Sequence, residues 1–141
     1  METAAQPYEF FDHTADIGII ARGQTLAEAF ANAGVALFAL MTDLSKVEEK
    51  VAVSIEVTAD DLEGLLVAWL NELLWYADAE GLLFKRFEIH EIMPTRLRAT
   101  AYGEPKDPSR HTFHLYVKAA TYHQASVSVD GGAQVRVIVD V

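Results

Sequence analysis

The sequence predicts an α+β fold in which two helices pack on an antiparallel or mixed sheet. Two segments place apolar residues at helical spacing, and most other segments alternate apolar and polar residues as strands do. Strands and helices do not alternate strictly along the chain, so a doubly wound parallel sheet is not favoured. With 141 residues, 51% of them hydrophobic, the chain has the size and composition of one globular domain.

Two short strands and one helix are predicted for the first third of the chain. Residues 8–11 are mostly aromatic and residues 17–22 are rich in isoleucine, and both compositions favour strands. Thr25 and Glu28 then form a capping box, in which the hydroxyl and the carboxylate accept backbone N–H groups left unpaired where a helix begins. Apolar residues recur three and four positions apart over residues 26–41, which predicts a well-buried helix.

The middle of the chain predicts a strand and a second helix. Residues 51–57 alternate apolar and polar side chains, as a half-buried strand does. Thr58 is expected to cap a helix that runs to about Tyr76, with Asp60 and Asp61 at the positive end of the helix dipole. Leucine and tryptophan side chains at helical spacing form the apolar stripe of this helix.

The remaining residues are predicted to be almost all strand. The predicted strands are residues 84–92, 96–102, 113–122, 125–129 and 135–139. Pro94 and Thr95 form a turn, residues 103–108 form a proline-rich loop, and residues 130–132 form a tight hairpin turn. The order of strand, capped helix and strands occurs twice along the chain, which indicates a loose internal duplication.

The charge and the residue types of the chain exclude several classes of function. Acidic residues outnumber basic ones by 21 to 11, for a net charge of −10. This argues against direct binding of nucleic acid or an anionic membrane, because phosphate contacts need clustered Lys and Arg. A partner with a basic surface, or a bound cation, fits better. The absence of cysteine excludes disulfides, thiolate catalysis and cysteine-ligated metal centres.

The N-terminal residues and the lack of long apolar stretches indicate the domain bounds and the location of the protein. Residues 1–7 lack the basic region and the apolar run of a signal peptide, so we expect a flexible segment there and a single domain at residues 8–141. No uninterrupted apolar stretch is long enough to span a membrane. We therefore expect a cytoplasmic protein.

Acidic residues near both ends of the chain suggest a metal site. If the first and last strands meet in one sheet, Asp16, Asp140 and the terminal carboxylate of Val141 converge. Such oxygen ligands suit a hard divalent cation such as Ca²⁺, Mg²⁺ or Mn²⁺. In the closing strand Val139 takes the core face, so Asp140 points to the other face. The alternatives are a turn role for Asp12 and Asp16 and simple solvent exposure for Asp140.

Five further residues are candidate neighbours of this site, each with a surface or structural role as its alternative. They are Asp12, His13, Lys118, Tyr122 and His123. A zinc site is not favoured, because His111 and His114 are three positions apart on a predicted strand and face opposite sides. No nucleophile elbow and no glycine-rich phosphate loop occurs in the sequence.

Several of these segments together resemble a known protein family. The first is Tyr8-Glu9-Phe10-Phe11-Asp12-His13-Thr14-Ala15-Asp16-Ile17-Gly18, which is similar to the N-terminal signature of the archease family. The other similar segments are residues 36–43, 69–74, 80–84, 103–108, 117–123 and 139–141. They occur in order from residue 8 to residue 141, so the resemblance covers nearly the whole chain.

The resemblance implies a fold, a function and a site. The fold is two strand–helix–strand–strand modules, one inserted in the other. The function is that of a non-enzymatic accessory protein for the GTP- and manganese-dependent RtcB-type RNA-splicing ligase, whose guanylylation and multiple turnover it promotes in tRNA splicing and RNA repair. The implied metal ligands are Asp16, Asp140 and the carboxylate of Val141. The family often ends in Asp-Ile, and the Asp-Val ending of this chain retains that carboxylate.

Two other functions remain open at this point. A stand-alone metal-dependent phosphohydrolase would use the same carboxylates, although the sequence offers no dedicated general base beside them. A chaperone-like binding module would use Trp75 and Tyr76, which lie on the flanks of the apolar stripe of the second helix. Aromatic side chains at such positions dominate many protein interfaces, although they are more often part of the core.

Overall fold

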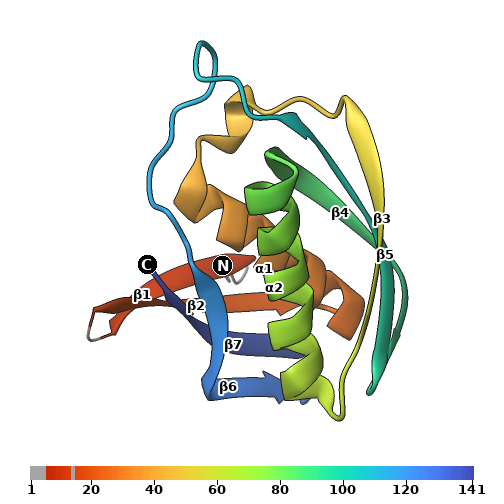
Figure 1. Ribbon diagram of the computed structural model, residues 1–141. Helices are drawn as coiled ribbons and strands as arrows, with labels where there is room; N and C mark the ends of the chain where they lie inside the picture. Colours follow the sequence, from red (N-terminus) through yellow and green to blue (C-terminus); the bar gives the residue numbers. More distant parts are fainter. Residues whose placement is uncertain (1–5, 14) are drawn as a thin grey trace, which may run out of the picture.

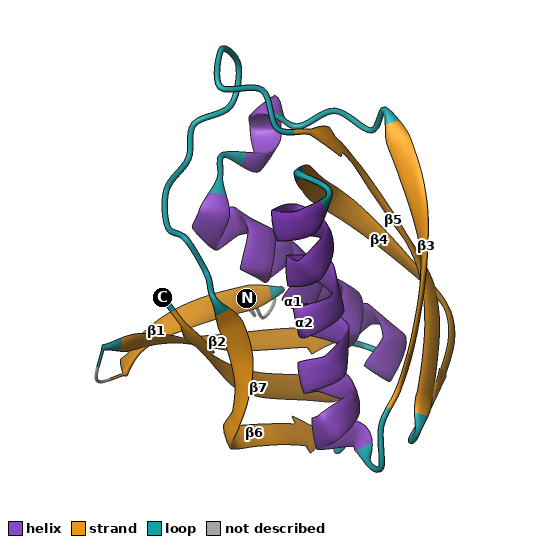
Figure 2. Cartoon of the chain, viewed as in Figure 1, coloured by secondary structure: helices purple, strands orange, loops and turns teal. Residues whose placement is uncertain are grey.

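The computed structural model describes residues 6–13 and 15–141, and its two long helices lie between two antiparallel sheets (Figure 1, Figure 2). The elements in chain order are β1 (Tyr8–His13), β2 (Asp16–Gly23), α1 (Leu26–Met41), the 3₁₀ helix η1 (Leu44–Lys46), β3 (Val51–Thr58), α2 (Leu62–Ala79), β4 (Leu82–Met93), β5 (Arg96–Pro105), β6 (Ala119–Ser128) and β7 (Ala133–Asp140). The α+β prediction is confirmed, with the strands divided between two sheets. Most of the segment predicted to be flexible, residues 1–7, lies outside the described residues.

The two sheets repeat one arrangement of strands. The larger sheet has the order β1-β2-β7-β6 and the smaller has the order β3-β5-β4. In both, the strand before the helix pairs with the last strand of its module, β2 with β7 and β3 with β5. The module β3–α2–β4–β5 is inserted between α1 and β6 of the other module. The nested duplication expected from the sequence is therefore present.

The helix caps show one confirmed and one wrong prediction. At the start of α1, the Thr25 hydroxyl accepts a hydrogen bond from Glu28 N–H at 3.1 Å, as the capping box predicts. At the start of α2 the cap is Asp61, whose Oδ1 accepts from Gly64 N–H at 2.7 Å. Thr58 was predicted in that role but ends β3, because the strand extends one residue further than its alternating pattern indicated.

Both helices contact both sheets, so one hydrophobic core joins the two modules. Helix α1 packs on β2 and β4, and α2 packs on β6 and β3. The two helices are also joined by a buried hydrogen bond from Trp69 Nε1–H to the Phe30 carbonyl at 2.9 Å. Neither helix in the described part of the chain combines the length and the apolarity that crossing a bilayer requires.

The segment before β6 differs from its prediction. A strand was predicted from Phe113, but β6 begins at Ala119, and residues 113–118 contribute only an isolated bridge between Phe113 and Thr42. The N–H groups of His114 and Leu115 instead donate to carbonyls at the end of α1. We call residues 106–118 the connecting segment, because they join β5 to β6 along one side of the helices (Figure 1).

The bounds of two other strands also differ from their predictions. Strand β5 continues to Pro105, although residues 103–108 were predicted to be a loop. Gly103 permits this, because a Cβ atom there would lie only 1.8 Å from the Leu83 carbonyl oxygen. Residues 119–122 and 125–128, which belong to two predicted strands, form one strand, β6, whose pairing with β7 is irregular between Thr121 and Ser126.

Candidate metal centre

The pairing of β2 with β7 brings the acidic residues of the two chain ends together. Asp16 and Asp140 are direct register partners across these antiparallel strands. His13 pairs with Asp16 on one side, and Ala119 pairs with Asp140 on the other. Directly opposite residues share one face of a sheet, with Cβ atoms roughly 5 Å apart. Four neighbouring strands therefore meet at one end of the sheet, where two carboxylates face the same side.

Strand alternation decides which acidic residues share this face. Val135, Val137 and Val139 are fully buried against the helices, so Asp140 points to the opposite face of the sheet, as predicted. Asp12 pairs with Ile17, one position out of step with Asp16. It therefore lies on the other face and is not brought to the two paired carboxylates.

The paired carboxylates have little compensating charge. Within residues 6–13 and 15–141, neither Asp16 nor Asp140 forms a salt bridge with Lys or Arg. The nearest ionisable nitrogen is His13 Nδ1, 3.8 Å from Asp16 Oδ2, and this buried atom has no hydrogen-bond partner among the described residues. The Asp16 side chain is 27% exposed. Like charges directly opposite each other destabilise a sheet, so this end of the molecule favours a cation.

The backbone around this end is strained. Ala15 has φ of 60° and Gln124 has φ of 57°, and these are the non-glycine residues with positive φ in the described part of the chain. A left-handed conformation costs a non-glycine residue about 1–2 kcal/mol. His123, next to Gln124, lies with its ring centroid 5.4 Å from that of His13. Both unfavourable conformations thus adjoin a pair of contacting imidazoles at the carboxylate end of the sheet.

The other residues predicted at this site differ in how close they lie to the paired carboxylates. Val141 directly follows β7 and is 36% exposed, so its carboxylate is one residue from Asp140. Lys118 contributes its backbone, whose N–H donates to the Asp140 carbonyl at 2.8 Å, while its side chain is exposed. Tyr122 is 68% exposed and lies beside Gly64, near the start of α2. Tyr122 is thus not brought to the paired carboxylates.

The described side chains at this end of the sheet cannot hold a metal ion without a further donor. Among the described residues, no three His, Asp or Glu side chains lie close enough to hold a metal ion by themselves. A site built on Asp16 and Asp140 therefore needs at least one further donor, and the carboxylate of Val141 is adjacent in the chain. The two side chains are opposite each other, and metal binding itself stays a prediction.

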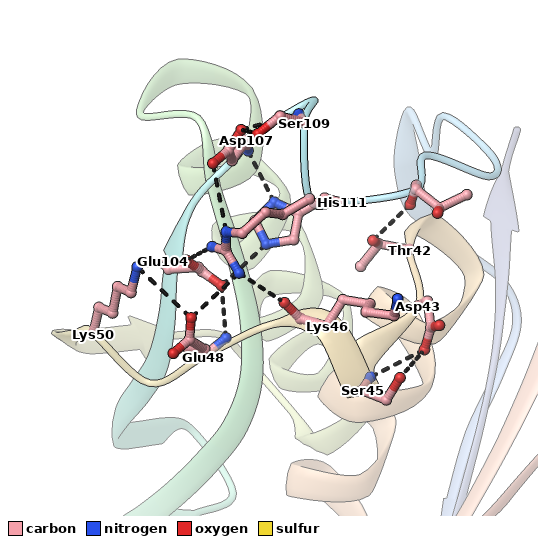
Figure 3. A network of polar contacts seen from close by, with 12 residues as sticks. Thr42, Asp43, Ser45, Lys46, Glu48, Lys50, Glu104, Asp107, Ser109 and His111 are labelled. Atoms are coloured by element: carbon pink, nitrogen blue, oxygen red, sulfur yellow. Dashed lines mark hydrogen bonds and ion pairs between the residues drawn. The ribbon is translucent and has the colours of Figure 1, made fainter.

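A second polar cluster, centred on Glu104, was not predicted from the sequence (Figure 3). Glu104 is 1% exposed, yet it accepts hydrogen bonds from Glu48 N–H at 2.7 Å and from His111 Nε2–H at 3.0 Å, and it pairs with Arg110. Asp107 N–H donates to His111 Nδ1 at 2.8 Å, which places the ring proton on Nε2. His111 is used in this cluster, and neither His111 nor His114 lies in a named strand, so the strand expected for these two histidines is wrong.

The ionisation of Glu104 follows from these contacts. Burial alone raises the pKa of its carboxyl group, but the hydrogen bonds from Glu48 N–H, His111 and Arg110 outweigh burial and lower the pKa to about 2. The cluster joins the end of β5, the residues just before β3 and the connecting segment, so it fixes the path of that segment (Figure 3). No single stretch of sequence signals it, because its members are up to 63 residues apart, from Glu48 to His111.

An aromatic surface lies on the second half of α2. Trp75 is 52% exposed and contacts the Tyr76 ring edge to face, with centroids 5.0 Å apart. One turn further, Asp78 accepts a hydrogen bond from the hydroxyl of Tyr116, which is 60% exposed. Trp75 therefore lies outside the core, a position that the sequence left open, and its exposure suits contact with another protein.

Comparison with known proteins finds a family and several relatives that this chain resembles. Residues 8–141 match the model of the archease protein family (MTH1598/TM1083). The chain is 47% identical over 136 residues to a protein archease of Sulfolobus acidocaldarius, covering 95% of this chain and 98% of that protein. It is 36% identical to a protein archease of Methanosarcina mazei over the whole length of both.

Two solved structures are also similar. The solution structure of protein 1598 of Methanobacterium thermoautotrophicum has a TM-score of 0.81 and 39% identity, covering 96% of this chain and 99% of that one. The crystal structure of an archease from Thermotoga maritima, described as a possible chaperone, has a TM-score of 0.63 over the full length of both chains. Its 17% identity makes it a likeness of fold alone.

Proposed function

The chain belongs to the archease family, and from this premise we propose that it is an accessory activator of a GTP-dependent RtcB-type RNA-splicing ligase. In this role it promotes guanylylation and multiple turnover of the ligase in tRNA splicing and RNA repair. It is not an enzyme in its own right. It acts through a carboxylate metal site at the end of the four-stranded sheet, and it works in the cytoplasm.

One observation carries this proposal. Asp16 and Asp140 face each other across β2 and β7 without a Lys or Arg partner among the described residues. A divalent cation compensates such a pair, and carboxylate oxygens are the donors that Ca²⁺, Mg²⁺ and Mn²⁺ prefer. The residues that would hold the ion are Asp16, Asp140 and Val141 through its terminal carboxylate. The Nδ1 of His13, which has no hydrogen-bond partner among residues 6–13 and 15–141, adds a nearby unsatisfied polar atom.

The chain supplies position and charge for this role. Guanylylation of a ligase develops charge on a nucleotide triphosphate, and a divalent ion bound at the site would neutralise part of it. The strands hold the two carboxylates on one rigid face, and the partial exposure of Asp16 lets a second protein reach them. The net charge of −10 favours approach to a basic nucleotide-binding surface.

The test is ligase guanylylation with GTP and Mn²⁺, in the presence of this protein or a variant of it. Asp16→Ala is expected to abolish the stimulation, because it removes one of the paired carboxylates. Asp12→Ala is the matched control, since Asp12 lies in the same hairpin on the opposite face and should leave stimulation unchanged. Full stimulation by a folded Asp16→Ala protein would contradict the metal-site proposal.

The same preparation separates the other functions. Release of phosphate from nucleotides or RNA by the isolated protein with Mn²⁺, without ligase, would favour a phosphohydrolase. A chaperone-like role through the exposed Trp75 predicts partner binding that survives chelation of metal and is lost in Trp75→Ala. The accessory role through the metal site predicts a different pattern, in which Asp16→Ala removes the stimulation although Mn²⁺ remains available to the ligase.

A further inference from the structure

A side chain of α2 holds the strand that borders the carboxylate end of the sheet. Asn71 Oδ1 accepts a hydrogen bond from Ala120 N–H at 2.8 Å, and Asn71 Nδ2–H donates to the Ala120 carbonyl at 3.2 Å. One amide thus satisfies both backbone groups of one residue, as a neighbouring strand would. Asn71 lies in residues 69–74, one of the segments that resemble the archease family, but it is not one of the proposed metal ligands.

The position of β6 explains why this contact matters. Strand β6 is at the edge of its sheet, with β7 as its strand partner. An edge strand leaves alternate N–H and C=O groups without a strand partner. Ala120 is only 5% exposed, so its backbone groups are largely shielded from water and would be costly to leave unpaired. Asn71 supplies the missing partner from the neighbouring helix.

The strand that Asn71 holds is short at this end. Register pairing of β6 with β7 covers Ala119 with Asp140, Ala120 with Val139 and Thr121 with Ile138, and it is then irregular up to Ser126. The connecting segment precedes it, and this segment is not a strand. Three residues between two irregular stretches therefore carry the pairing, and Asn71 binds the central one.

These three residues border the backbone that carries Asp140. Ala119 is the register partner of Asp140, and the preceding residue, Lys118, donates its N–H to the Asp140 carbonyl at 2.8 Å. Loss of the Asn71 contact frees residue 120 from the helix, and the neighbouring pairing with Asp140 loosens with it. The direction of the Asp140 carboxylate depends on that backbone.

We infer that Asn71 is a positioning residue for the carboxylate centre, acting through Ala120 and Lys118 on the backbone of Asp140. Its effect on ligase stimulation rests on the proposed function, whereas its effect on the backbone of Asp140 does not. The Asn71 side chain thus acts on the carboxylate end of the sheet through the backbone of its neighbours.

The test compares two asparagine variants in the metal-free and metal-loaded protein. Asn71→Leu keeps a similar size and loses both hydrogen bonds. The matched control is Asn32→Leu, since Asn32 on α1 donates to the Arg22 carbonyl at 2.7 Å, near the opposite end of β2. Both side-chain contacts are partly buried, so both variants are expected to be destabilised to a similar degree.

The first readout is amide hydrogen exchange without metal. Asn71→Leu is expected to speed exchange of the Lys118 amide about 10-fold relative to amides of the helical core, and Asn32→Leu is not. The variant Asn71→Asp keeps the acceptor for Ala120 N–H and should give an intermediate rate, which serves if Asn71→Leu does not fold. An unchanged Lys118 rate in a folded Asn71 variant overturns the inference.

The second readout is the affinity for Mn²⁺ alone, measured by electron paramagnetic resonance. Loss of a residue that orients a ligand lowers metal affinity about 10-fold, and this is expected for Asn71→Leu but not for Asn32→Leu. If wild-type protein binds no Mn²⁺ while Lys118 exchange responds to Asn71, the metal site fails and the positioning role stands. If Mn²⁺ binds equally in wild type and Asn71→Leu, the positioning role fails and the metal site stands.

Discussion

The two carboxylate clusters of this protein differ in burial and in the number of donors that compensate their charge. Glu104 is buried and is surrounded by donors, a backbone N–H, an imidazole N–H and a guanidinium. Asp16 and Asp140 are only partly buried, and they face each other with an unpaired imidazole nitrogen as the nearest ionisable neighbour in the described part of the chain. A carboxylate with all its donors in place stabilises the fold. Two carboxylates without such donors leave negative charge that a bound cation can neutralise.

The backbone shows the same contrast. The carboxylate end of the larger sheet contains Ala15 and Gln124 in left-handed conformations, next to the contacting histidines. The Glu104 cluster contains no such residue within the described chain. Strained conformations persist where the surrounding structure imposes them, and they concentrate at functional sites. These two contrasts fit a structural role for Glu104 and are in line with the functional role proposed for the paired aspartates.

Removing the charge of Glu104 should have the largest effect on stability. Glu104→Gln removes the buried anion that Arg110 and His111 contact and turns an amide N–H₂ toward existing donors, so we expect a loss of about 3 kcal/mol in the free energy of unfolding. Urea denaturation measures it. The surface pair of Glu49 and Arg86, 2.9 Å apart, provides the control, and Glu49→Gln should cost about 0.5 kcal/mol. Equal losses in the two variants would refute the structural role of Glu104.

Acid should remove the same stabilisation without a mutation. The pKa of Glu104 falls from 4.5 to about 2 on folding, so its contribution is complete above pH 4.5 and is lost as the pH falls toward 2. Stability of the wild type should therefore drop more steeply over this range than that of Glu104→Gln. Urea midpoints measured across the range give the two slopes. Parallel curves for the two proteins would show that Glu104 does not carry the low pKa.

Metal should stabilise one cluster and not the other. At free Mn²⁺ about 100 times its dissociation constant, binding to the native state alone adds about 2.7 kcal/mol to the free energy of unfolding. Asp140→Asn should lose this gain, while its metal-free stability stays within about 0.5 kcal/mol of wild type because a repulsion is removed. Thermal denaturation with Mn²⁺ or chelator tests both statements. Asp12→Asn should keep the full metal response, and a loss there would place the site elsewhere.

The smallest effect is expected at the exposed margin of the Glu104 cluster. Lys50 Nζ lies 3.5 Å from Glu104 Oε1, but its side chain is 55% exposed. Solvent screens such a pair, so Lys50→Gln should cost no more than about 0.5 kcal/mol. Chemical denaturation compared with Glu104→Gln gives the ratio. A loss similar to that of Glu104→Gln would mean that Lys50, and not the buried donors, holds the carboxylate.

Local patterns predicted most of the fold because they depend on near neighbours. The bounds of α1 and the capping box of Thr25 and Glu28 agree with the structure, since helical spacing and caps depend on residues three or four positions apart. The face of Asp140 was also correct, because strand alternation depends on the next residue. The resemblance to the archease family added the nesting of the two modules, which local patterns only suggested.

Predictions failed where a distant segment takes the backbone hydrogen bonds. Residues 113–118 have the apolar content of a strand, but His114 and Leu115 donate to the end of α1 and no strand forms. Asp61 replaces Thr58 as the cap because pairing with β5 extends β3 to Thr58. The Glu104 cluster had no local signal, since its donors come from two separated segments, residues 48–50 and 110–111.

The sequence by itself determined the helices, the alternation that turns Asp140 away from the core, and the excess of acidic residues, because each depends on composition or on nearby positions. Only the tertiary structure decided that Asp16 stands opposite Asp140, that Asn71 holds the strand beside them, and that Glu104 is neutralised by donors from elsewhere. Asp16 and Asp140 are 124 positions apart, Asn71 and Ala120 are 49 apart, and Glu104 and its donor Glu48 are 56 apart, and strand register and helix packing bring them together.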